Sequence, residues 1–277
     1  MDSLTDLELS LLLEGIFRRY GFDFRNYAHA SLKRRIQQCM KAEQVGTISA
    51  LQEKVLHDAT CFERLLLNLS IHVTSMFRDP RFYRIFRQEI VPYLQTYPFI
   101  RIWHAGCSTG EEVYSMAILL EEERLYDRAR IYATDFNTAV LSRAETGIFP
   151  LRVMQEYTGN YILAEGKQAF SDYYTARYDH VIFRPALQRN IVWAQHNLVT
   201  DGSFNEFHVI VCRNTMIYFN KTLQDRVHHL FHDSLIASGF LGLGSKESIR
   251  FTPHAQAYSL MDEQEKWYRK APRGSAP

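Results

Sequence analysis

The stretch at 100–120 constrains the fold of this chain more than any other part, and it reads I-R-I-W-H-A-G-C-S-T-G-E-E-V-Y-S-M-A-I-L-L. Its pattern predicts a buried strand at 100–104, a tight turn of small residues at 105–110, and an amphipathic helix that begins at Glu111. A strand, a glycine-bounded turn and a helix N-terminus form the first unit of a nucleotide-binding α/β domain. The sequence therefore predicts that such a domain starts here.

The turn departs from the G-x-G-x-x-G pattern, and two acids follow it. A pyrophosphate needs backbone N–H groups and no local negative charge at the helix start, so Glu111 and Glu112 would repel it. One acid at this position is explained by the helix dipole alone. Two acids beside a ligand loop suit a cationic ligand better, and we interpret the loop as a site for the amino-acid end of S-adenosylmethionine.

Residues 1–78 are predicted to form an all-helical domain. The helix expected at 29–42 has an apolar face and a polar face, and the polar face carries Lys33, Arg34 and Lys41. Such a charged face is usually just solvated, and docking of an acidic partner helix is the alternative interpretation. Asp79 before Pro80 then predicts the start of a further helix, with Asp79 as its N-cap.

Beyond the opening unit, residues 130–135 are predicted to form a second strand that ends in Asp135. An acid at this tip is placed to accept both ribose hydroxyls of a nucleoside, whereas a helix N-cap is the generic explanation. The ligand loop upstream favours the ribose role. The near-continuous apolar run at 207–212 is typical of a parallel strand buried on both faces.

The alternation of strands and helices predicts an α/β fold with a doubly wound, Rossmann-like parallel sheet. We expect this domain to span 79–270, with a small antiparallel β insertion at about 150–190, where the sequence is rich in tyrosine and irregular. The last residues, 271–277, are expected to be a disordered tail.

Composition limits the setting in which the protein works. The formal net charge of +1 gives no electrostatic reason to expect nucleic-acid binding. No apolar run approaches the roughly 18 residues of a membrane span, and the N-terminus lacks the regions of a signal peptide. The cysteines, which fit reduced thiols in a cytoplasm and show no metal spacing, are Cys39, Cys61, Cys107 and Cys212. We therefore expect a cytoplasmic protein without a metal or membrane insertion.

Three stretches resemble one family in their order and sequence: T-S-M-F-R-D at 74–79, A-G-C-S-T-G-E-E-V-Y-S at 105–115, and C-R-N-T-M-I-Y-F at 212–219. The family is that of the CheR-type chemotaxis receptor methyltransferases, and the resemblance covers nearly the whole chain. It implies an S-adenosylmethionine-dependent protein-glutamate O-methyltransferase that releases S-adenosylhomocysteine. Such enzymes esterify glutamates on the cytoplasmic helical domain of methyl-accepting chemoreceptors during sensory adaptation. We expect a monomer.

The resemblance also implies roles for single residues. Arg78 and Tyr218 resemble the pair that faces the transferred methyl group, and we assign Arg78 to orientation of the acceptor carboxylate. Glu112 would hold the methionyl amine of the cofactor. The residues implied as cofactor contacts are His72, Thr74, Arg78, Glu112, Asp135, Asn197, Leu198, Cys212 and Arg213. At His72 many members of the family have asparagine.

Docking of the receptor can be expected at either of two places. Some members of the family bind the receptor's C-terminal pentapeptide on the antiparallel insertion, through a longer loop that contains glycine. The corresponding turn here, R-Y-D-H at 177–180, is short and has no glycine. We therefore predict that the receptor tail is not needed, and that Lys33, Arg34 and Lys41 bind the acidic methylation helices directly.

Two other functions stay open at this point. Residues 106–110 also match G-x-S-x-G, the nucleophile elbow of α/β-hydrolases, with Ser108 as nucleophile. Against a hydrolase, the strand is the first of its sheet and no convincing oxyanion loop lies upstream. The second alternative is a regulatory module that binds S-adenosylmethionine or S-adenosylhomocysteine without turnover.

Overall fold

The computed structural model describes residues 4–69 and 74–272, and their contacts divide into two units. The helical unit consists of 4–69 with 218–226, and the sheet unit consists of 74–217 with 227–272. Residues 74–78, which we assigned to the helical domain, thus group with the sheet. The reason is Phe77, whose fully buried ring lies 5.0 Å from that of Tyr83 and 5.2 Å from that of Tyr161. The predicted tail at 271–277 lies mostly outside the described residues.

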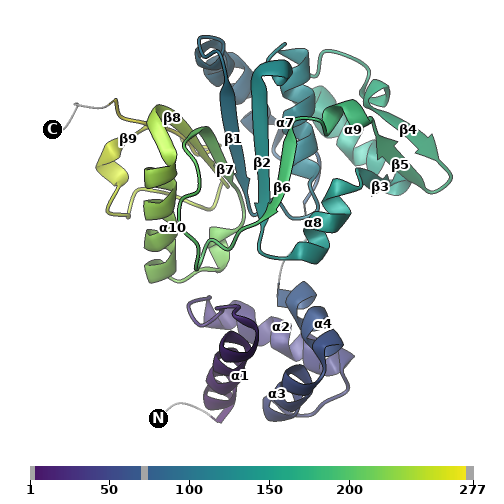
Figure 1. Ribbon diagram of the computed structural model, residues 1–277, viewed down its shortest axis with the longest axis vertical. Helices are drawn as coiled ribbons and strands as arrows, with labels where there is room; N and C mark the ends of the chain where they lie inside the picture. The colour runs from purple at the N-terminus through teal and green to yellow at the C-terminus, as the bar shows by residue number, and fades with distance from the viewer. Residues whose placement is uncertain (1–3, 70–73, 273–277) are drawn as a thin grey trace. The chain divides into compact units, whose positions relative to one another are not determined.

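The N-terminal residues of the helical unit form the helices labelled in Figure 1: α1 (Leu4–Tyr20), α2 (His29–Ala42), α3 (Ile48–His57) and α4 (Ala59–Leu69). The bounds of α2 coincide with the predicted helix at 29–42, and Leu32, Ile36 and Cys39 are buried as the periodicity indicated. The fourth buried residue of α2 is Arg35, which is only 5% exposed. A guanidinium group therefore lies on the apolar side of this helix.

The segment 218–226 joins the helical unit through backbone hydrogen bonds to the residues just before α2. The amide of Ala28 donates to the carbonyl of Tyr218 at 2.7 Å, and the amide of Asn220 donates to the carbonyl of Asn26 at 2.8 Å. An isolated antiparallel bridge also pairs Tyr27 with Phe219. The helical unit is consequently built from two separate parts of the sequence.

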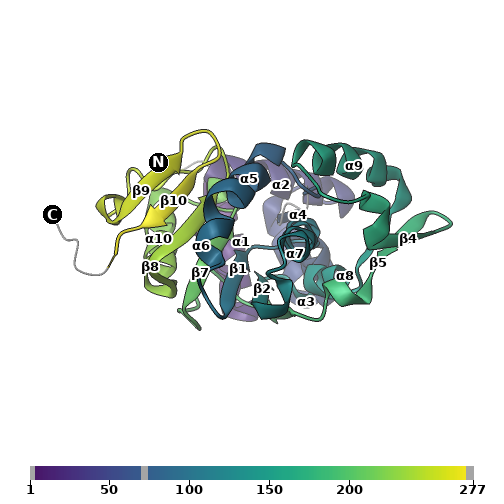
Figure 2. The same cartoon turned by 90° about the horizontal axis from the view of Figure 1, so that it is seen from above.

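The sheet unit is built on a seven-stranded sheet with the strand order β6-β2-β1-β7-β8-β10-β9, which can be followed in Figures 1 and 2. The strands are β1 (Ile100–Ala105), β2 (Ala129–Asp135), β6 (Ile191–Gln195), β7 (Phe207–Cys212), β8 (Leu235–Leu243), β9 (Tyr258–Asp262) and β10 (Trp267–Lys270). β1 pairs in parallel with β2 and β7, while β10 runs antiparallel to β8 and β9. The order reverses between β1 and β7, and open α/β sheets bind ligands outside the carboxyl ends of their strands at such a point.

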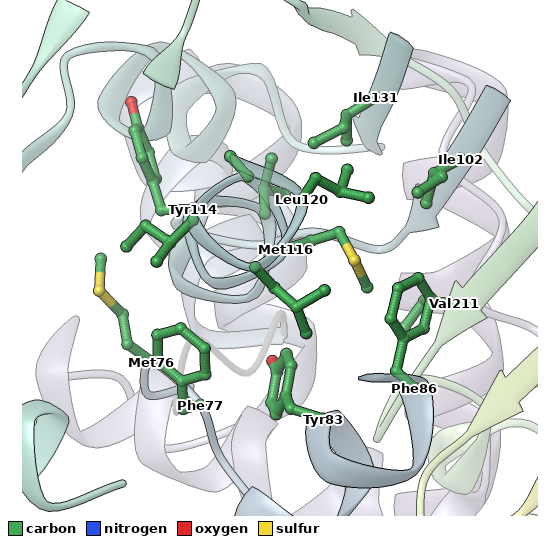
Figure 3. Packing of buried hydrophobic residues seen from close by; sticks show 14 of the residues in the cluster. Met76, Phe77, Tyr83, Phe86, Ile102, Tyr114, Met116, Leu120, Ile131 and Val211 are labelled. Atoms are coloured by element: carbon green, nitrogen blue, oxygen red, sulfur yellow. The ribbon is translucent and has the colours of Figure 1, made fainter. Parts of the chain in front are cut away.

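The helices of the sheet unit cover both faces of the sheet, which confirms the predicted doubly wound fold. They are α5 (Pro80–Ile85), a π-helical turn (Phe86–Ile90), α6 (Val91–Leu94), α7 (Glu111–Glu122), α8 (Thr138–Glu145), α9 (Met154–Leu163) and α10 (Lys221–Ser234), whose first residues belong to the helical unit. Side chains alternate along β1, so Ile102 packs in one core with α7 and the 76–86 segment (Figure 3). Trp103 points to the other face, where its ring lies 5.5 Å from that of Phe231 in α10.

A second, three-stranded sheet confirms the small antiparallel insertion. Its order is β3-β5-β4, from β3 (Ile148–Pro150), β4 (Tyr174–Arg177) and β5 (His180–Phe183), and both pairings are antiparallel. Short 3-10 turns complete the unit: Tyr126–Arg128, Leu151–Val153, Phe170–Tyr173, Pro185–Leu187, Met216–Tyr218 and Ala255–Ala257.

Across 4–69 and 74–272, no helix combines the length and the apolar character that crossing a membrane requires. The same ranges contain no group of three or more histidine, cysteine, aspartate or glutamate side chains that could hold a metal ion.

Candidate functional site

The turn after β1 takes a conformation that depends on its glycines. Gly106 and Gly110 have φ angles of +79° and +91°, which residues with a side chain rarely adopt. A Cβ atom on Gly106 would also lie 2.7 Å from Oγ1 of Thr215, in the turn after β7. The two turns at the carboxyl ends of β1 and β7 are thus in contact, and only glycine allows this approach.

Asp135 is the last residue of β2 and binds directly to the turn at 105–110, which is the predicted ligand turn. Its Oδ2 accepts a hydrogen bond from the amide of Ser108 at 3.0 Å, and its Oδ1 accepts one from the amide of Asn137 at 3.0 Å. The residue is 7% exposed, and burial raises the pKa of its carboxyl although the backbone N–H groups oppose this shift. The N-cap of α8 is Asn137, whose side chain accepts from the amide of Ala139, so the generic capping role does not fall to Asp135.

The two acids at the start of α7 point to different partners. Glu111 is buried, where its Oε2 accepts a hydrogen bond from Oγ1 of Thr109 at 2.6 Å and its Oε1 lies 3.4 Å from the hydroxyl of Tyr157. Glu112 instead contacts Nδ1 of His104 at 2.9 Å and Nη1 of Arg213 at 3.1 Å. Of the pair, only Glu112 is therefore part of a charged cluster at the carboxyl edge of the sheet.

Arg213 is the centre of that cluster. Its Nη1 donates to the carbonyl of Arg78 at 3.2 Å as well as to Glu112, and its Nη2 donates to the carboxylate of Asp79. The side chain is 3% exposed, and its guanidinium lies 4.2 Å from the ring centroid of Phe82. One guanidinium thus joins all three stretches on which the family resemblance rests.

Charge pairing decides the protonation states in this cluster. Burial alone would raise the pKa of Glu112, but the hydrogen bond from His104 and the charge of Arg213 outweigh it, and the pKa is lowered. Burial would likewise lower the pKa of Arg213, whereas the negative charge of Glu112 raises it. Glu112 is therefore an anion at neutral pH.

The segment that carries Arg78 is held in an unusual backbone conformation. Phe77 and Asp79 have φ angles of 50° and 57°, in the left-handed region that costs energy for residues other than glycine. The amide of Phe77 donates to Oγ of Ser115 at 2.9 Å, and Nδ2 of Asn160 donates to the carbonyl of Met76 at 3.0 Å. Anchors from α7 and α9 thus fix the backbone just before Arg78.

The predicted N-cap role of Asp79 is only partly correct. α5 begins at Pro80, as predicted, but the side chain of Asp79 makes no capping hydrogen bond. Its carboxylate pairs with Arg213 instead, because the left-handed conformation of Asp79 is not the extended one in which an N-cap side chain reaches the helix.

Three of the other implied cofactor contacts, Asn197, Leu198 and Cys212, lie at or just after the ends of strands. Asn197 and Leu198 follow β6, next to the end of β2, since the amide of His196 donates to the carbonyl of Asp135 at 3.1 Å. Oδ1 of Asn197 accepts from the amide of Val199 at 3.0 Å. Cys212 ends β7 and is fully buried, which raises the pKa of its thiol, and Thr74 is half-buried in the Arg78 segment. His72 lies outside the described residues.

Tyr218 lies in the helical unit, where its partner is a residue that the sequence analysis missed. The guanidinium of Arg35 lies 4.8 Å from the ring centroid of Tyr218. Arg35 also donates to the carbonyls of Asn68 and Leu69, at 3.2 and 2.6 Å. Burial lowers the pKa of Arg35. No local pattern could have identified Arg35, because its partners lie far away in the sequence.

The polar face of α2 carries less free positive charge than we expected. Lys33 pairs with Asp6 of α1, with Nζ 2.5 Å from Oδ1. Arg34 and Lys41 are exposed.

On the insertion, the turn between Arg177 and His180 is short, as its sequence indicated, and Tyr178 at its tip is 97% exposed. A surface pocket of about 800 Å³ lies beside this turn and is lined by charged and apolar side chains of the insertion and of the end of α8.

The hydrogen-bonding groups of the site fit S-adenosylmethionine. Carboxylates of Asp135 and Glu112 accept hydrogen bonds from hydroxyl and ammonium groups, and they would repel phosphate. The side chain of Glu112 remains 16% exposed, although it is already paired.

Comparisons with known proteins agree with this geometry. The family model "CheR methyltransferase, SAM binding domain" matches residues 72–266, and "CheR methyltransferase, all-alpha domain" matches residues 7–70. The chain is 50% identical to Cher3 of Pseudomonas putida, provisionally named a methyltransferase, over 96% of this chain and 98% of that protein.

More distant proteins are also similar. A chemotaxis protein methyltransferase of Listeria innocua is 31% identical, over 89% of this chain and 92% of that protein. The glycopeptide N-methyltransferase MtfA, solved with S-adenosylmethionine, aligns with 10% identity and a TM-score of 0.37 over 62% of this chain and 54% of that one, which is too slight a likeness to add to the argument. The two family models and the relatives show that this chain belongs to the CheR methyltransferase family.

Proposed function

We propose that this protein transfers the methyl group of S-adenosylmethionine to glutamate side chains of a methyl-accepting chemoreceptor, as part of sensory adaptation. The observation that carries the proposal is the meeting of the three family stretches at Arg213. The relatives named chemotaxis protein methyltransferases support the receptor as substrate. The receptor's helical domain is cytoplasmic, so we propose that the protein works in the cytoplasm, as a monomer.

We propose that S-adenosylmethionine is held mainly by described residues along the carboxyl edge of the sheet. In this proposal Asp135 accepts the ribose hydroxyls, Glu112 accepts the methionyl ammonium, and Asn197 with Leu198 flanks the adenine. The remaining contacts are His72, Thr74, Arg78, Cys212 and Arg213. When bound, the cofactor supplies a methyl group activated by a positively charged sulfur, to which the carbon–sulfur electron pair returns when a carboxylate oxygen bonds to the methyl carbon.

The chain's own residues have little acid–base chemistry to perform. A glutamate side chain is already anionic at pH 7, so no general base is needed. What the reaction needs is alignment of one carboxylate oxygen and removal of water around it. We assign orientation to Arg78 through a charge-assisted hydrogen bond to the carboxylate, with Tyr218 completing the hold.

Replacing Asp135 by alanine should weaken the binding of both S-adenosylmethionine and S-adenosylhomocysteine by about 1–3 kcal/mol, because ribose hydroxyls would be left without an acceptor. Isothermal calorimetry with each ligand measures the change. Asp172→Ala, which removes an exposed acid of the same unit, is the matched control and should bind normally. Equal affinity of Asp135→Ala and wild type would remove Asp135 from the site.

Reversing the two exposed charges of α2, with Arg34→Glu and Lys41→Glu together, should raise the Michaelis constant for receptor and flatten its dependence on salt. Exposed charge pairs contribute only about 0.2–1 kcal/mol each, but they steer the encounter and are screened by salt. Cofactor affinity should not change. Arg18→Glu with Arg19→Glu on α1 makes the same change in net charge and should have little effect.

A receptor that lacks its last five residues should still be methylated. Loss of methylation on this deletion would indicate that the receptor docks on the insertion.

The central test is incubation with methyl-labelled S-adenosylmethionine and membranes that contain candidate receptors. Base-labile label on receptor protein is the expected result, since carboxyl methyl esters hydrolyse in base. Label only on nucleic acid or small molecules would contradict the proposal. Cofactor binding without any transfer would favour the regulatory alternative, and labelling of Ser108 by a serine-reactive phosphonate would favour the hydrolase.

A further inference from the structure

Glu247 lies just after β8 and binds the turn that follows β7. Its carboxylate accepts hydrogen bonds from four backbone amides: Asn214 at 3.0 Å, Thr215 at 3.0 Å, Met216 at 2.8 Å and Gly244 at 2.7 Å. The residue is 5% exposed. Neither the sequence analysis nor the proposed site contains it.

The amides around this carboxylate form an anion-binding concavity. Asn214 has a φ of 58°, and successive N–H groups in such a turn converge on one point, as they do in backbone sites for phosphate. Here the chain's own carboxylate fills the concavity. Gly244 is needed for this, because a Cβ atom there would lie 2.8 Å from Oε2 of Glu247 and 2.9 Å from the amide nitrogen of Asn214.

The turn held in this way presents functional groups on both sides. Arg213 precedes it and donates to Glu112 and to the Arg78 carbonyl. Thr215 lies against Gly106 of the ligand turn. The 3-10 turn Met216–Tyr218 continues it and ends in the proposed acceptor-facing tyrosine. A shift in the amides of residues 214–216 would therefore displace Arg213 from Glu112 and from the Arg78 carbonyl.

We infer that Glu247 is a positioning residue: by filling the concavity it fixes the turn that presents Arg213 to Glu112 and to the segment that carries Arg78. The inference rests on the proposed function for the roles of Glu112 and Arg78. Only an acceptor with two oxygens can serve all four amides at once. A glutamine of the same shape would turn an NH₂ group toward two of these donors.

Glu247→Gln should lower kcat for receptor methylation by roughly 10- to 100-fold, the usual consequence of small misplacement at a site that works by alignment. The Michaelis constant for receptor should change much less. Kinetics are measured at a temperature at which circular dichroism shows the variant fully folded. In hydrogen-exchange NMR, the amides of Asn214, Thr215 and Met216 should exchange at least about tenfold faster, since each loses a charge-assisted hydrogen bond.

The matched control is Glu122→Gln. The Glu122 carboxylate is also buried, and it accepts from the amide of Lys167 at 2.9 Å and the hydroxyl of Tyr173 at 2.9 Å, away from the turn after β7. This variant should lose thermal stability but keep the kcat and the amide exchange of residues 214–216.

The outcomes separate the two proposals. Unchanged kcat of fully folded Glu247→Gln, or unchanged exchange of the three amides, would overturn the role of Glu247. If wild-type protein methylates no receptor, the proposed function fails, and the amide exchange still decides whether Glu247 holds the turn. If fully folded Glu122→Gln shows the same fall in kcat as fully folded Glu247→Gln, the role of Glu247 is only a general structural one. That result would overturn the inference.

Discussion

Arg213→Met is expected to lower the free energy of unfolding by about 3–5 kcal/mol, because it leaves a carboxylate in a largely buried site without its charged partner. Methionine keeps the packing on Phe82 but cannot donate to Glu112, to Asp79 or to the Arg78 carbonyl. Urea unfolding at pH 7, followed by circular dichroism, measures the change. The methylation activity per folded molecule of Arg213→Met should also be lower than that of wild type, because the Arg78 segment loses an anchor.

The pH dependence of this effect has a definite sign. Pairing holds the pKa of Glu112 in the folded protein below its value in the unfolded chain, which is about 4.3. The stabilisation from this carboxylate is therefore complete above that unfolded pKa and is lost as the pH falls through the lower folded pKa. The difference between wild type and Arg213→Met should be largest near neutral pH and should shrink below about pH 4.

Arg81→Met is the matched control for this experiment. Arg81 pairs with Asp262 at 2.6 Å, but its side chain is 46% exposed, so the same substitution should cost only about 0–1 kcal/mol. Equal losses in the two variants would show that the Arg213 cluster has no special weight in the fold.

Tyr218→Phe is expected to lower kcat about 10- to 100-fold, which corresponds to one hydrogen bond to a charged group, of about 1.5–3 kcal/mol. The affinity for S-adenosylhomocysteine should stay the same, because the hydroxyl is assigned to the acceptor and not to the cofactor. Single-turnover transfer to receptor gives the rate, and calorimetry gives the affinity. Tyr93→Phe, at a surface position of α6, should behave like wild type.

Two results would return Tyr218 to a structural role. One is an equal loss of transfer rate and cofactor affinity. The other is a loss of stability with normal transfer, which would point to the contact with Arg35 as the main function of the ring.

Local patterns predicted the elements of the fold and the edge of the sheet on which the site lies. The periodicity at 29–42 gave the correct bounds of α2, and the alternation along the chain predicted a doubly wound sheet with a small antiparallel insertion. The carboxyl ends of parallel strands meet at one edge of a sheet. The sequence alone therefore predicted that Asp135, at the end of the second strand, lies near the ligand turn.

What the sequence could not predict are contacts between residues far apart along the chain. Arg35 carries no local signal in the sequence, and only packing against Tyr218 and the end of α4 explains its burial. Glu247 follows a strand without any recognisable motif, and three of its four amide partners lie more than thirty residues away. Asp79 looked like an N-cap, because a local rule takes no account of an arginine at position 213.

The backbone pairing of Tyr27 and Phe219 bears on how this protein could be cut or recombined. The matches to the two family models suggest a simple division near residue 71, with one half exchangeable between relatives. A fragment that ended there would lack residues 218–226 and leave Tyr27, the amide of Ala28 and the carbonyl of Asn26 without their partners. A chimera should therefore take residues 218–226 from the same parent as the helices. For the same reason, co-evolving pairs between relatives should link the stretch before α2 with the stretch after β7, across almost two hundred positions of intervening sequence.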